Sequence, residues 1–127
     1  MTQTVLCVDS SGAVGDVERA VSADPTLSPI SATTVESATE RIESEDIDAL
    51  VTEYTLDDDS GLSLIERLRS EQPQTPAVLF TDSRPGDIDT ATFEETIVEY
   101  LSKDVPNAHD QIAPILTDLI QHSAQVG

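Results

Sequence analysis

The sequence VLCVD at residues 5–9 is a short apolar run that ends in an aspartate. A run of this length without polar alternation is typical of a β-strand that is buried on both faces. Cys7, the only cysteine, lies within it, where a buried thiol is the simplest interpretation. Apolar residues then recur at helical spacing from Ala13 to Val21, and we expect this helix to end near residues 24–25. The chain therefore opens with a strand followed by a helix.

The same pairing of an apolar run with a helical pattern is repeated four more times along the chain. Strands are predicted at residues 29–34, 47–52, 76–81 and 97–101. Helices are predicted after them, over Val35 to Ile42, Leu62 to Leu68, residues 82–95 and Ile112 to Ile120. Five strands that alternate with five helices predict an α/β fold, a doubly wound sheet of five parallel strands with the flavodoxin-like (βα)5 order.

Two local signals refine the helix starts. Ser60 precedes the third helix, and its hydroxyl is available to cap a free amide there. Pro114 fits the last helix only near its first turn, because proline lacks the amide hydrogen that a helix interior uses. We therefore expect a side-chain cap at Ser60 and a first-turn position for Pro114.

The charge of the chain excludes several functions. Its 127 residues include 25 acidic and six basic ones, which gives a formal net charge of −19. Such a field repels phosphates, so we expect neither nucleic acid nor a membrane as a partner. No apolar run could span a membrane and the start resembles no secretory signal, which predicts a single cytoplasmic domain over residues 1–127. The composition resembles that of halophilic archaeal proteins, whose acidic surfaces are screened by salt.

Four residues with chemically useful side chains stand at the ends of the predicted strands: Asp9, Glu53, Thr81 and Lys103. The carboxyl ends of parallel strands form the functional crevice of such a sheet, so we expect these side chains to meet there. Lys103 is the only lysine in the chain, which favours a specific partner over a solvated position. We predict that Lys103 pairs with Glu53 and lies close to Asp9.

Five motifs together resemble the receiver domain of two-component response regulators over essentially the whole chain. They are VLCVD (5–9), the strand that leads to Glu53, the helix start Gly61-Leu62, LFT (79–81) and YLSK (100–103). The resemblance implies that the third strand ends where a histidine kinase or a small phosphodonor delivers a phosphoryl group. It also implies a Mg²⁺ site beside that position, and a hydroxyl and an ammonium group that hold phosphoryl oxygens. Asp9, Thr81 and Lys103 match this pattern.

Other positions depart from the family pattern, among them Asp57 and Asp104, which stand where the family commonly has proline, and three further residues at the pocket. Glu53 stands where the family has the phosphoacceptor aspartate, and its extra methylene moves the carboxylate by more than about an ångström, which is enough to prevent an in-line attack. Ser10 replaces the second acid of the cation pair, so Mg²⁺ on Asp9 and Glu53 is expected to bind weakly or not at all. Asp82 adds a negative charge near the pocket. No other cofactor is expected.

These departures predict a degenerate receiver that is not an enzyme and acts in signal transduction through protein–protein contact, without phosphorylation at the usual position. The expected partner is a histidine kinase or another receiver. The face of the fourth helix, fifth strand and fifth helix is expected to bind that partner or a second copy of the chain, through Phe93, Tyr100 and part of the stripe Ile112–Ile120. Tyr100 also matches an aromatic that changes orientation on activation in the family. Glu53 either imitates the phosphorylated state in part or only neutralises Lys103, and the sequence leaves both open.

Two further functions stay open. A receiver could be phosphorylated slowly on Glu53 or on another acid such as Asp57–Asp59, although a solvated acidic loop is the simpler interpretation of that run. A flavodoxin-like nucleotide or flavin binder would need a Gly-rich phosphate turn, and residues 10–15 offer only weak spacing for one. His109 and His122 lack metal-binding spacing and are expected to be solvated helix residues.

Overall fold

The apolar runs form one parallel β-sheet in a computed structural model of the chain, which describes residues 2–56, 58–82 and 98–126. The strand order is β2-β1-β3-β4-β5, and every neighbouring pair is parallel. The strands are β1 Gln3–Val8, β2 Leu27–Ala32, β3 Ala49–Thr52, β4 Ala77–Thr81 and β5 Val98–Ser102. The helices are α1 Val14–Ser22, α2 Val35–Ser44, α3 Gly61–Glu71 and α4 Ala108–Val126. The predicted fold class is confirmed, while the helix predicted over 82–95 lies almost wholly outside the described residues.

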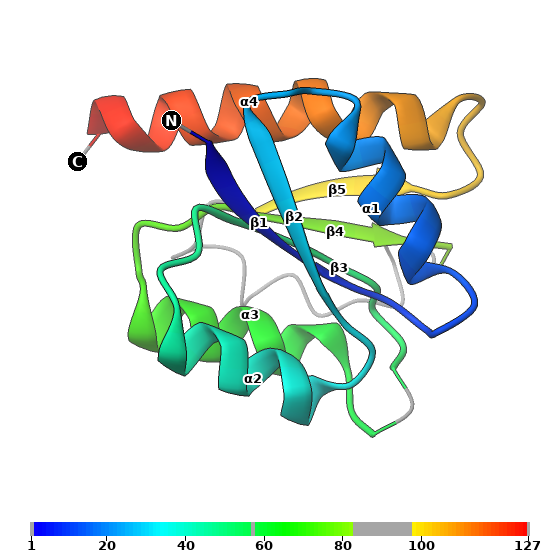
Figure 1. Cartoon of the computed structure of the whole chain (residues 1–127). Coiled ribbons are helices and arrows are strands. Elements are labelled where there is room, and N and C mark those ends of the chain that lie inside the picture. The colour runs from blue at the N-terminus through cyan, green and yellow to red at the C-terminus, as the bar shows by residue number, and fades with distance from the viewer. Residues whose placement is uncertain (1, 57, 83–97, 127) are drawn as a thin grey trace.

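Helices cover both faces of the sheet, with α1 and α4 on one side and α2 and α3 on the other (Figure 1). The inner strand β1 shows why both layers are needed. Val5 and Cys7 pack into the α1/α4 layer, and the alternate residues Leu6 and Val8 pack into the α2/α3 layer. All four side chains are buried. The unbroken apolar run of the sequence is therefore the signature of a strand with a core on each face.

The second strand begins and ends two residues earlier than predicted. Pro29 lies inside β2, in register with Val5 of β1, instead of marking its start. β2 is an edge strand that pairs only with β1, so a residue without an amide hydrogen is tolerated when that position faces away from the ladder.

The position of Pro114 also differs from the prediction. α4 begins at Ala108, so Pro114 lies beyond the first turn of the helix. Pro114 and Asp110 are both exposed, so the carbonyl that loses its amide partner is accessible to water. The Thr117 hydroxyl donates a hydrogen bond to the Pro114 carbonyl at 3.0 Å. The helix continues past the proline because the carbonyl that loses its amide partner lies on the solvent side, where water can hydrogen-bond to it.

The start of α3 is held by close backbone packing, and the predicted side-chain cap is wrong. Ser60 is the N-cap residue, but its hydroxyl makes no capping hydrogen bond. The Gly61 amide instead donates to the Tyr54 carbonyl at 2.6 Å. A Cβ on Gly61 would lie 2.1 Å from the Glu53 carbonyl oxygen. The helix start thus rests directly against the loop after β3, at a distance that only glycine permits.

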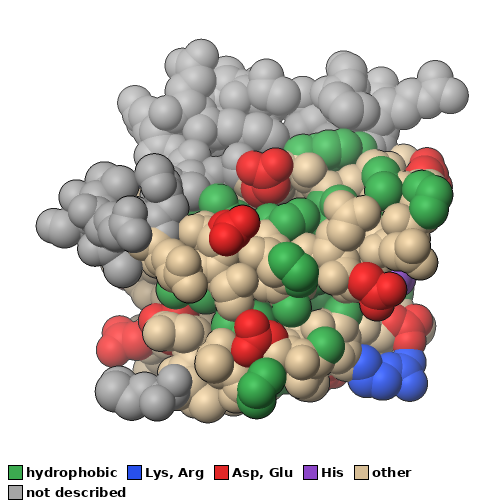
Figure 2. Space-filling model, turned by 90° about the horizontal axis from the view of Figure 1, so that it is seen from above, with side chains coloured by type: hydrophobic (Ala, Val, Ile, Leu, Met, Phe, Trp, Pro, Cys, Tyr) green, Lys and Arg blue, Asp and Glu red, His purple; other side chains and the backbone are tan. Residues whose placement is uncertain are grey.

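The face formed by α1 and α4 carries acidic side chains dispersed among polar and apolar ones (Figure 2). Val105, which precedes α4, is the only large hydrophobic residue that is exposed in the described part of the chain, at 39%. The apolar stripe of α4 is turned mainly to the sheet, where Ile112 and Leu116 are fully buried. This face is therefore mixed in character, and single hydrophobic residues are common on such surfaces.

Replacing Gly61 by alanine is expected to destabilise the fold by about 1–3 kcal/mol, because the new methyl group overlaps the backbone after β3. Gly15 in α1 is the matched control, since nothing lies within 4 Å of its Cβ position. Gly15→Ala is expected to stabilise the fold by about 0.5–1 kcal/mol through helix propensity. Urea unfolding in molar KCl compares the two, and equal effects would contradict the packing argument.

Cys7 offers a probe of how the fold depends on salt. Burial of the thiol, together with the negative charge of Glu18, raises its pKa from 9.0 to about 12. We expect negligible reaction with a thiol reagent in molar KCl at mildly alkaline pH, and faster reaction as salt is withdrawn, because the −19 charges then repel without screening. Labelling rates over a KCl series measure this. Uniformly slow labelling at every salt concentration would contradict a salt-adapted protein.

Candidate functional site

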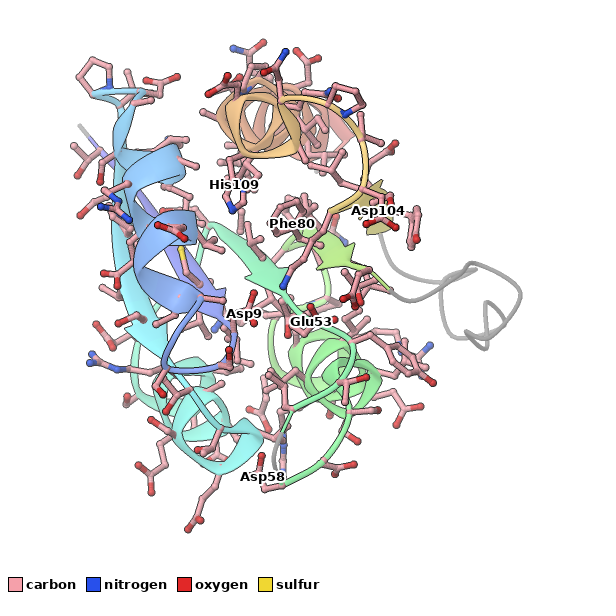
Figure 3. The ribbon with its side chains drawn as sticks, turned by 90° about the vertical axis from the view of Figure 1, so that its right-hand side faces the viewer. Asp9, Glu53, Asp58, Phe80, Asp104 and His109 are labelled. Atoms are coloured by element: carbon pink, nitrogen blue, oxygen red, sulfur yellow. The ribbon has the colours of Figure 1, made fainter. Side chains whose placement is uncertain are left out.

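Four polar residues meet where the carboxyl ends of β1, β3 and β4 and the segment after β5 come together. Asp9 and Glu53 follow β1 and β3, Thr81 is the last residue of β4, and Lys103 follows β5. Asp9 is 3% exposed, Glu53 is 7% exposed and Thr81 is fully buried. Figure 3 shows the Asp9 and Glu53 side chains at this edge of the sheet. The sequence-predicted residues Asp9, Glu53, Thr81 and Lys103 are therefore brought together.

The backbone of each site residue is fixed by the strand next to it. The Asp9 amide donates to the Ala32 carbonyl at 3.4 Å, which extends the ladder between β1 and β2 by one residue. In the same way the Glu53 amide donates to the Val8 carbonyl at 2.9 Å. The Lys103 amide donates to the Thr81 carbonyl, also at 2.9 Å. The sheet thus sets where the side chains start, even though three of them lie just outside its strands.

The Glu53 carboxylate has a hydrogen-bond donor at each oxygen. Oε1 accepts from the Tyr54 amide at 2.8 Å, from the Thr55 amide at 3.4 Å and from the Thr81 hydroxyl. Oε2 lies 2.6 Å from the Lys103 ammonium. A buried carboxylate needs such partners to offset the loss of water. The negative charge of Glu53 is therefore compensated by partners within the pocket.

Lys103 bridges the two buried acids. Its Nζ lies 2.7 Å from Asp9 Oδ2 and 2.6 Å from Glu53 Oε2, with 23% of its side chain exposed. The other oxygen of Asp9 accepts from the Ser10 amide at 2.7 Å. Burial lowers the pKa of Lys103, but hydrogen bonds from its ammonium to Asp9 and Glu53 and the charges of these acids outweigh burial and raise the pKa above 10.5. The lysine is therefore held charged between its partners.

Ser10, Asp82 and Tyr100 lie at the margins of this cluster. Ser10 contributes its backbone amide to Asp9, while its side chain is exposed. Asp82 directly follows Thr81, and its side chain is exposed as well. Tyr100 is half-buried and packs against the α2/α3 layer. Phe93 and the side chain of His122 lie outside what the structure describes.

The acidic loop after β3 is more than the solvated run that the sequence suggests. Asp58 is exposed, yet Oδ1 accepts from the Val35 amide at 2.9 Å and Oδ2 accepts from the Glu36 amide at 3.1 Å. These are the first two residues of α2, so Asp58 caps a helix distant in the sequence. Its hydrogen bonds, that from Val35 above all, hold the pKa of Asp58 below its ordinary value. Asp57 is not among the described residues.

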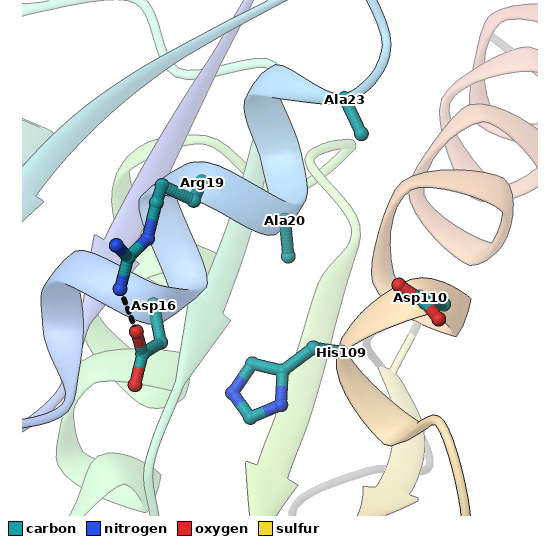
Figure 4. Close-up of a pocket in the computed structure, with 6 residues that line it drawn as sticks. All are labelled: Asp16, Arg19, Ala20, Ala23, His109 and Asp110. Carbon is teal, nitrogen blue, oxygen red and sulfur yellow. Dashed lines mark hydrogen bonds and ion pairs between the residues drawn. The ribbon is translucent and has the colours of Figure 1, made fainter.

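Phe80 and His109 connect the acid cluster to a groove between α1 and α4. The His109 ring packs edge-on against Phe80 with 5.1 Å between ring centroids, so His109 is exposed but not free of contacts. Lys103 Nζ lies 5.5 Å from the centre of the same Phe80 ring. His109 also lines an open groove between α1 and α4, with Asp16, Arg19, Ala20, Ala23 and Asp110 (Figure 4). Sequence reasoning missed this contact, because no spacing links residue 80 to residue 109.

The model of the response regulator receiver domain family matches residues 5–114. The chain belongs to this family. Among solved structures, a CheY-like receiver domain from Methanospirillum hungatei JF-1 superposes with a TM-score of 0.85 at 19% identity, and the alignment covers 100% of both chains. The receiver domain of an HD domain-containing protein from Pseudomonas fluorescens Pf-5 gives 0.83 at 20% identity, with 98% of this chain and 90% of that one covered.

The response regulator domain of Thermotoga maritima CheB gives a TM-score of 0.77 at 18% identity, over 100% of this chain and 99% of that one. At such identities the likeness shows a common fold. No curated protein is similar enough in sequence to count as a relative. Among the described residues, no helix has the length and apolar character that crossing a membrane requires.

The Mg²⁺ site that the receiver family implies does not fit the donors found here. Asp9 Oδ2 and Glu53 Oε2 both contact the Lys103 ammonium, and the exposed side chain of Ser10 brings no carboxylate. The described residues contain no group of three or more His, Cys, Asp or Glu that could hold a metal ion. Hard divalent cations take about six oxygen ligands. Two carboxylates with an ammonium between them do not supply that environment.

Lys103 is expected to stabilise the fold up to alkaline pH. A lysine whose pKa is higher in the folded state stabilises it fully below the unfolded value of 10.5, and this contribution is lost as pH rises through the folded pKa. Lys103→Met should cost about 3 kcal/mol at neutral pH, because two buried carboxylates lose their cation. The difference between the two proteins, measured by urea unfolding, should shrink only above pH 10.5. A difference that is already lost near neutrality would contradict this ion pair.

Proposed function

We propose that this receiver domain signals by binding a partner protein without being phosphorylated at Glu53. The observation that carries the proposal is the environment of the Glu53 carboxylate, whose two oxygens already engage the Thr81 hydroxyl and the Lys103 ammonium. Receiver domains in general act as signalling modules, so a fixed pocket still leaves the outer faces of the fold available for contact.

The geometry disfavours Glu53 as a phosphoryl acceptor. A carboxylate nucleophile needs an oxygen that can approach phosphorus in line, and small misplacements are costly. Oε1 receives three hydrogen bonds and Oε2 receives the ammonium. Attack by either oxygen would break these contacts in a pocket where Glu53 is 7% exposed.

The same contacts give Glu53 a second role as a partial substitute for a phosphoryl group. By the family resemblance, Thr81 and Lys103 are the groups that would hold phosphoryl oxygens, and here they hold a carboxylate. The substitution is incomplete, because a carboxylate brings one charge and two oxygens where a phosphoryl group brings about two charges and three oxygens. The pocket is thereby kept in one state, and the response of a partner decides whether that state is the active one.

The docking surface that we propose lies around β5 and α4. Tyr100 is half-buried at this edge strand, Val105 is exposed, and Ile115 and Leu119 of α4 are only partly buried. A histidine kinase, another receiver or a second copy of the chain would bind through these side chains. The helix predicted over residues 82–95, which the sequence assigns to this face, lies almost wholly outside the described residues.

Intact mass after incubation with acetyl phosphate and Mg²⁺ in molar KCl tests the proposal. We expect no mass change for the natural chain, and a gain of one phosphoryl group for Glu53→Asp, which withdraws the carboxylate from Lys103 and frees an oxygen. Glu53→Ala is the control and should stay unmodified.

A phosphoryl adduct on the natural chain would overturn the proposal. Peptide mapping would then identify the acid and favour the alternative of a phosphorylatable receiver. If neither protein is modified, Ser10, which brings no carboxylate to a cation, and Asp82, which adds a negative charge, also prevent phosphoryl transfer. Sedimentation velocity without a phosphodonor then tests self-association directly.

A further inference from the structure

We propose that the Lys103 ammonium is the resident cation of the acid pocket and occupies the position that a divalent cation would take between Asp9 and Glu53. With Glu53 in place, the pocket then binds Mg²⁺ or Mn²⁺ only when Lys103 is removed. This inference rests on the proposed function and deepens it, since it explains how the pocket keeps one state without an external cofactor.

The convergence of two oxygens on one point is the first observation. Asp9 and Glu53 follow different strands, and Asp9 Oδ2 and Glu53 Oε2 both lie within 2.7 Å of Lys103 Nζ. Oxygens from two carboxylates that meet around one centre are the usual core of a site for a hard cation. In this chain the centre is an ammonium group.

The remaining carboxylate oxygens are turned to other donors. Asp9 Oδ1 accepts from the Ser10 amide, and Glu53 Oε1 accepts from two amides and from the Thr81 hydroxyl. These contacts hold both side chains in rotamers that aim one oxygen each at Nζ. A cation that replaced the ammonium would therefore find the same two oxygens already oriented.

The ammonium is fixed in this position by its own attachments. The Lys103 backbone amide is bonded to the Thr81 carbonyl at 2.9 Å, which anchors the start of the side chain. Its Nζ lies 5.5 Å from the centre of the Phe80 ring, within the range of a cation–π contact. Phe80 is itself buried against His109. Withdrawal of the ammonium from the pocket would therefore break its contacts with both carboxylates and with the Phe80 ring.

For electrostatic reasons, the Lys103 ammonium and a divalent metal ion cannot occupy the pocket together. Two carboxylates and one ammonium leave a single negative charge, which is too little to hold a divalent ion beside an ammonium that repels it. Removal of the ammonium leaves two buried carboxylates facing each other, a state that is costly without a cation. A divalent cation would then offset that cost.

The experiment compares thermal unfolding of the natural chain, Lys103→Met and Arg19→Met in molar KCl, with and without millimolar MgCl2 at constant ionic strength. Methionine keeps the length of the lysine stem but carries no charge. Arg19→Met changes the net charge by the same amount at an exposed ion pair with Asp16, so it measures divalent binding to the acidic surface alone.

We expect Lys103→Met to unfold at a lower temperature than the natural chain and to regain several degrees with Mg²⁺ in a saturable manner. The natural chain and Arg19→Met should respond little and alike. A larger Mg²⁺ response in the natural chain than in Arg19→Met would overturn the inference, as would a folded Lys103→Met protein that gains nothing.

A second measurement on the natural chain covers the case in which Lys103→Met does not fold. Mn²⁺ broadens nuclear magnetic resonance signals of nearby amides, so a cation in the pocket would broaden Ser10 and Tyr54 selectively. We expect these two amides to be broadened no more than that of the exposed Asp104. Selective broadening at Ser10 and Tyr54 would overturn the inference. Neither measurement uses a phosphodonor, so its failure is distinct from failure of the mass test.

Discussion

Two carboxylates are buried side by side at the carboxyl edge of this sheet, and the rest of the pocket follows from the need to neutralise them. Charges withdrawn from water are tolerated only when they are paired and hydrogen-bonded. Lys103 supplies the charge, and Thr81 and the amides of Ser10, Tyr54 and Thr55 supply the hydrogen bonds. These donors come from the ends of different strands. The ion pairs connect the ends of β1, β3 and β5, and the Thr81 hydroxyl adds the end of β4.

The sheet requires only apolar residues at buried positions, whereas the pocket requires particular polar side chains. Receiver domains at 17–20% identity superpose on this chain with TM-scores of 0.77–0.85, so the fold tolerates wide changes of sequence. Such tolerance is expected where the requirement is only an apolar run with a core on each face. The contacts of the pocket depend on a few side chains, chiefly Asp9, Glu53, Thr81 and Lys103, which lie at the ends of the strands. The fold of this chain therefore does not by itself determine what the pocket does.

Features that depend on neighbouring residues in the sequence could be predicted, whereas contacts that depend on how distant segments fold together could not. Strands such as Val5–Val8 could be predicted because burial on both faces is written in consecutive residues. The meeting of Glu53 with Lys103 could be predicted because both end parallel strands, whose carboxyl ends share one edge. The position of the start of α3 at Ser60 and Gly61 was also predicted, but the contact that holds it was not, since the close approach of Gly61 to the Glu53 carbonyl depends on how the loop folds back.

Edge position and solvent access explain two other errors. Pro29 seemed to mark the beginning of a strand, but the open side of an edge strand admits proline within it. Pro114 seemed to require a first turn, but the solvent side of α4 admits it further along. The contact between Phe80 and His109 joins residues from separate layers and left no trace in the spacing.

The two hydrogen bonds from Asp58 to the start of α2 give the loop after β3 a mechanical role. Glu53 begins this loop, and the Asp58 carboxylate accepts hydrogen bonds from the Val35 and Glu36 amides. Gly61, at the end of the loop, packs against the Glu53 carbonyl. A movement that drew Glu53 away from Lys103 would pull on the first turn of α2 as well. The acid pocket and the first turn of α2 thus lie at the same carboxyl edge of the sheet and are joined by one short loop, so a substitution at Asp58 would loosen the start of α2 and the loop beside Glu53 together.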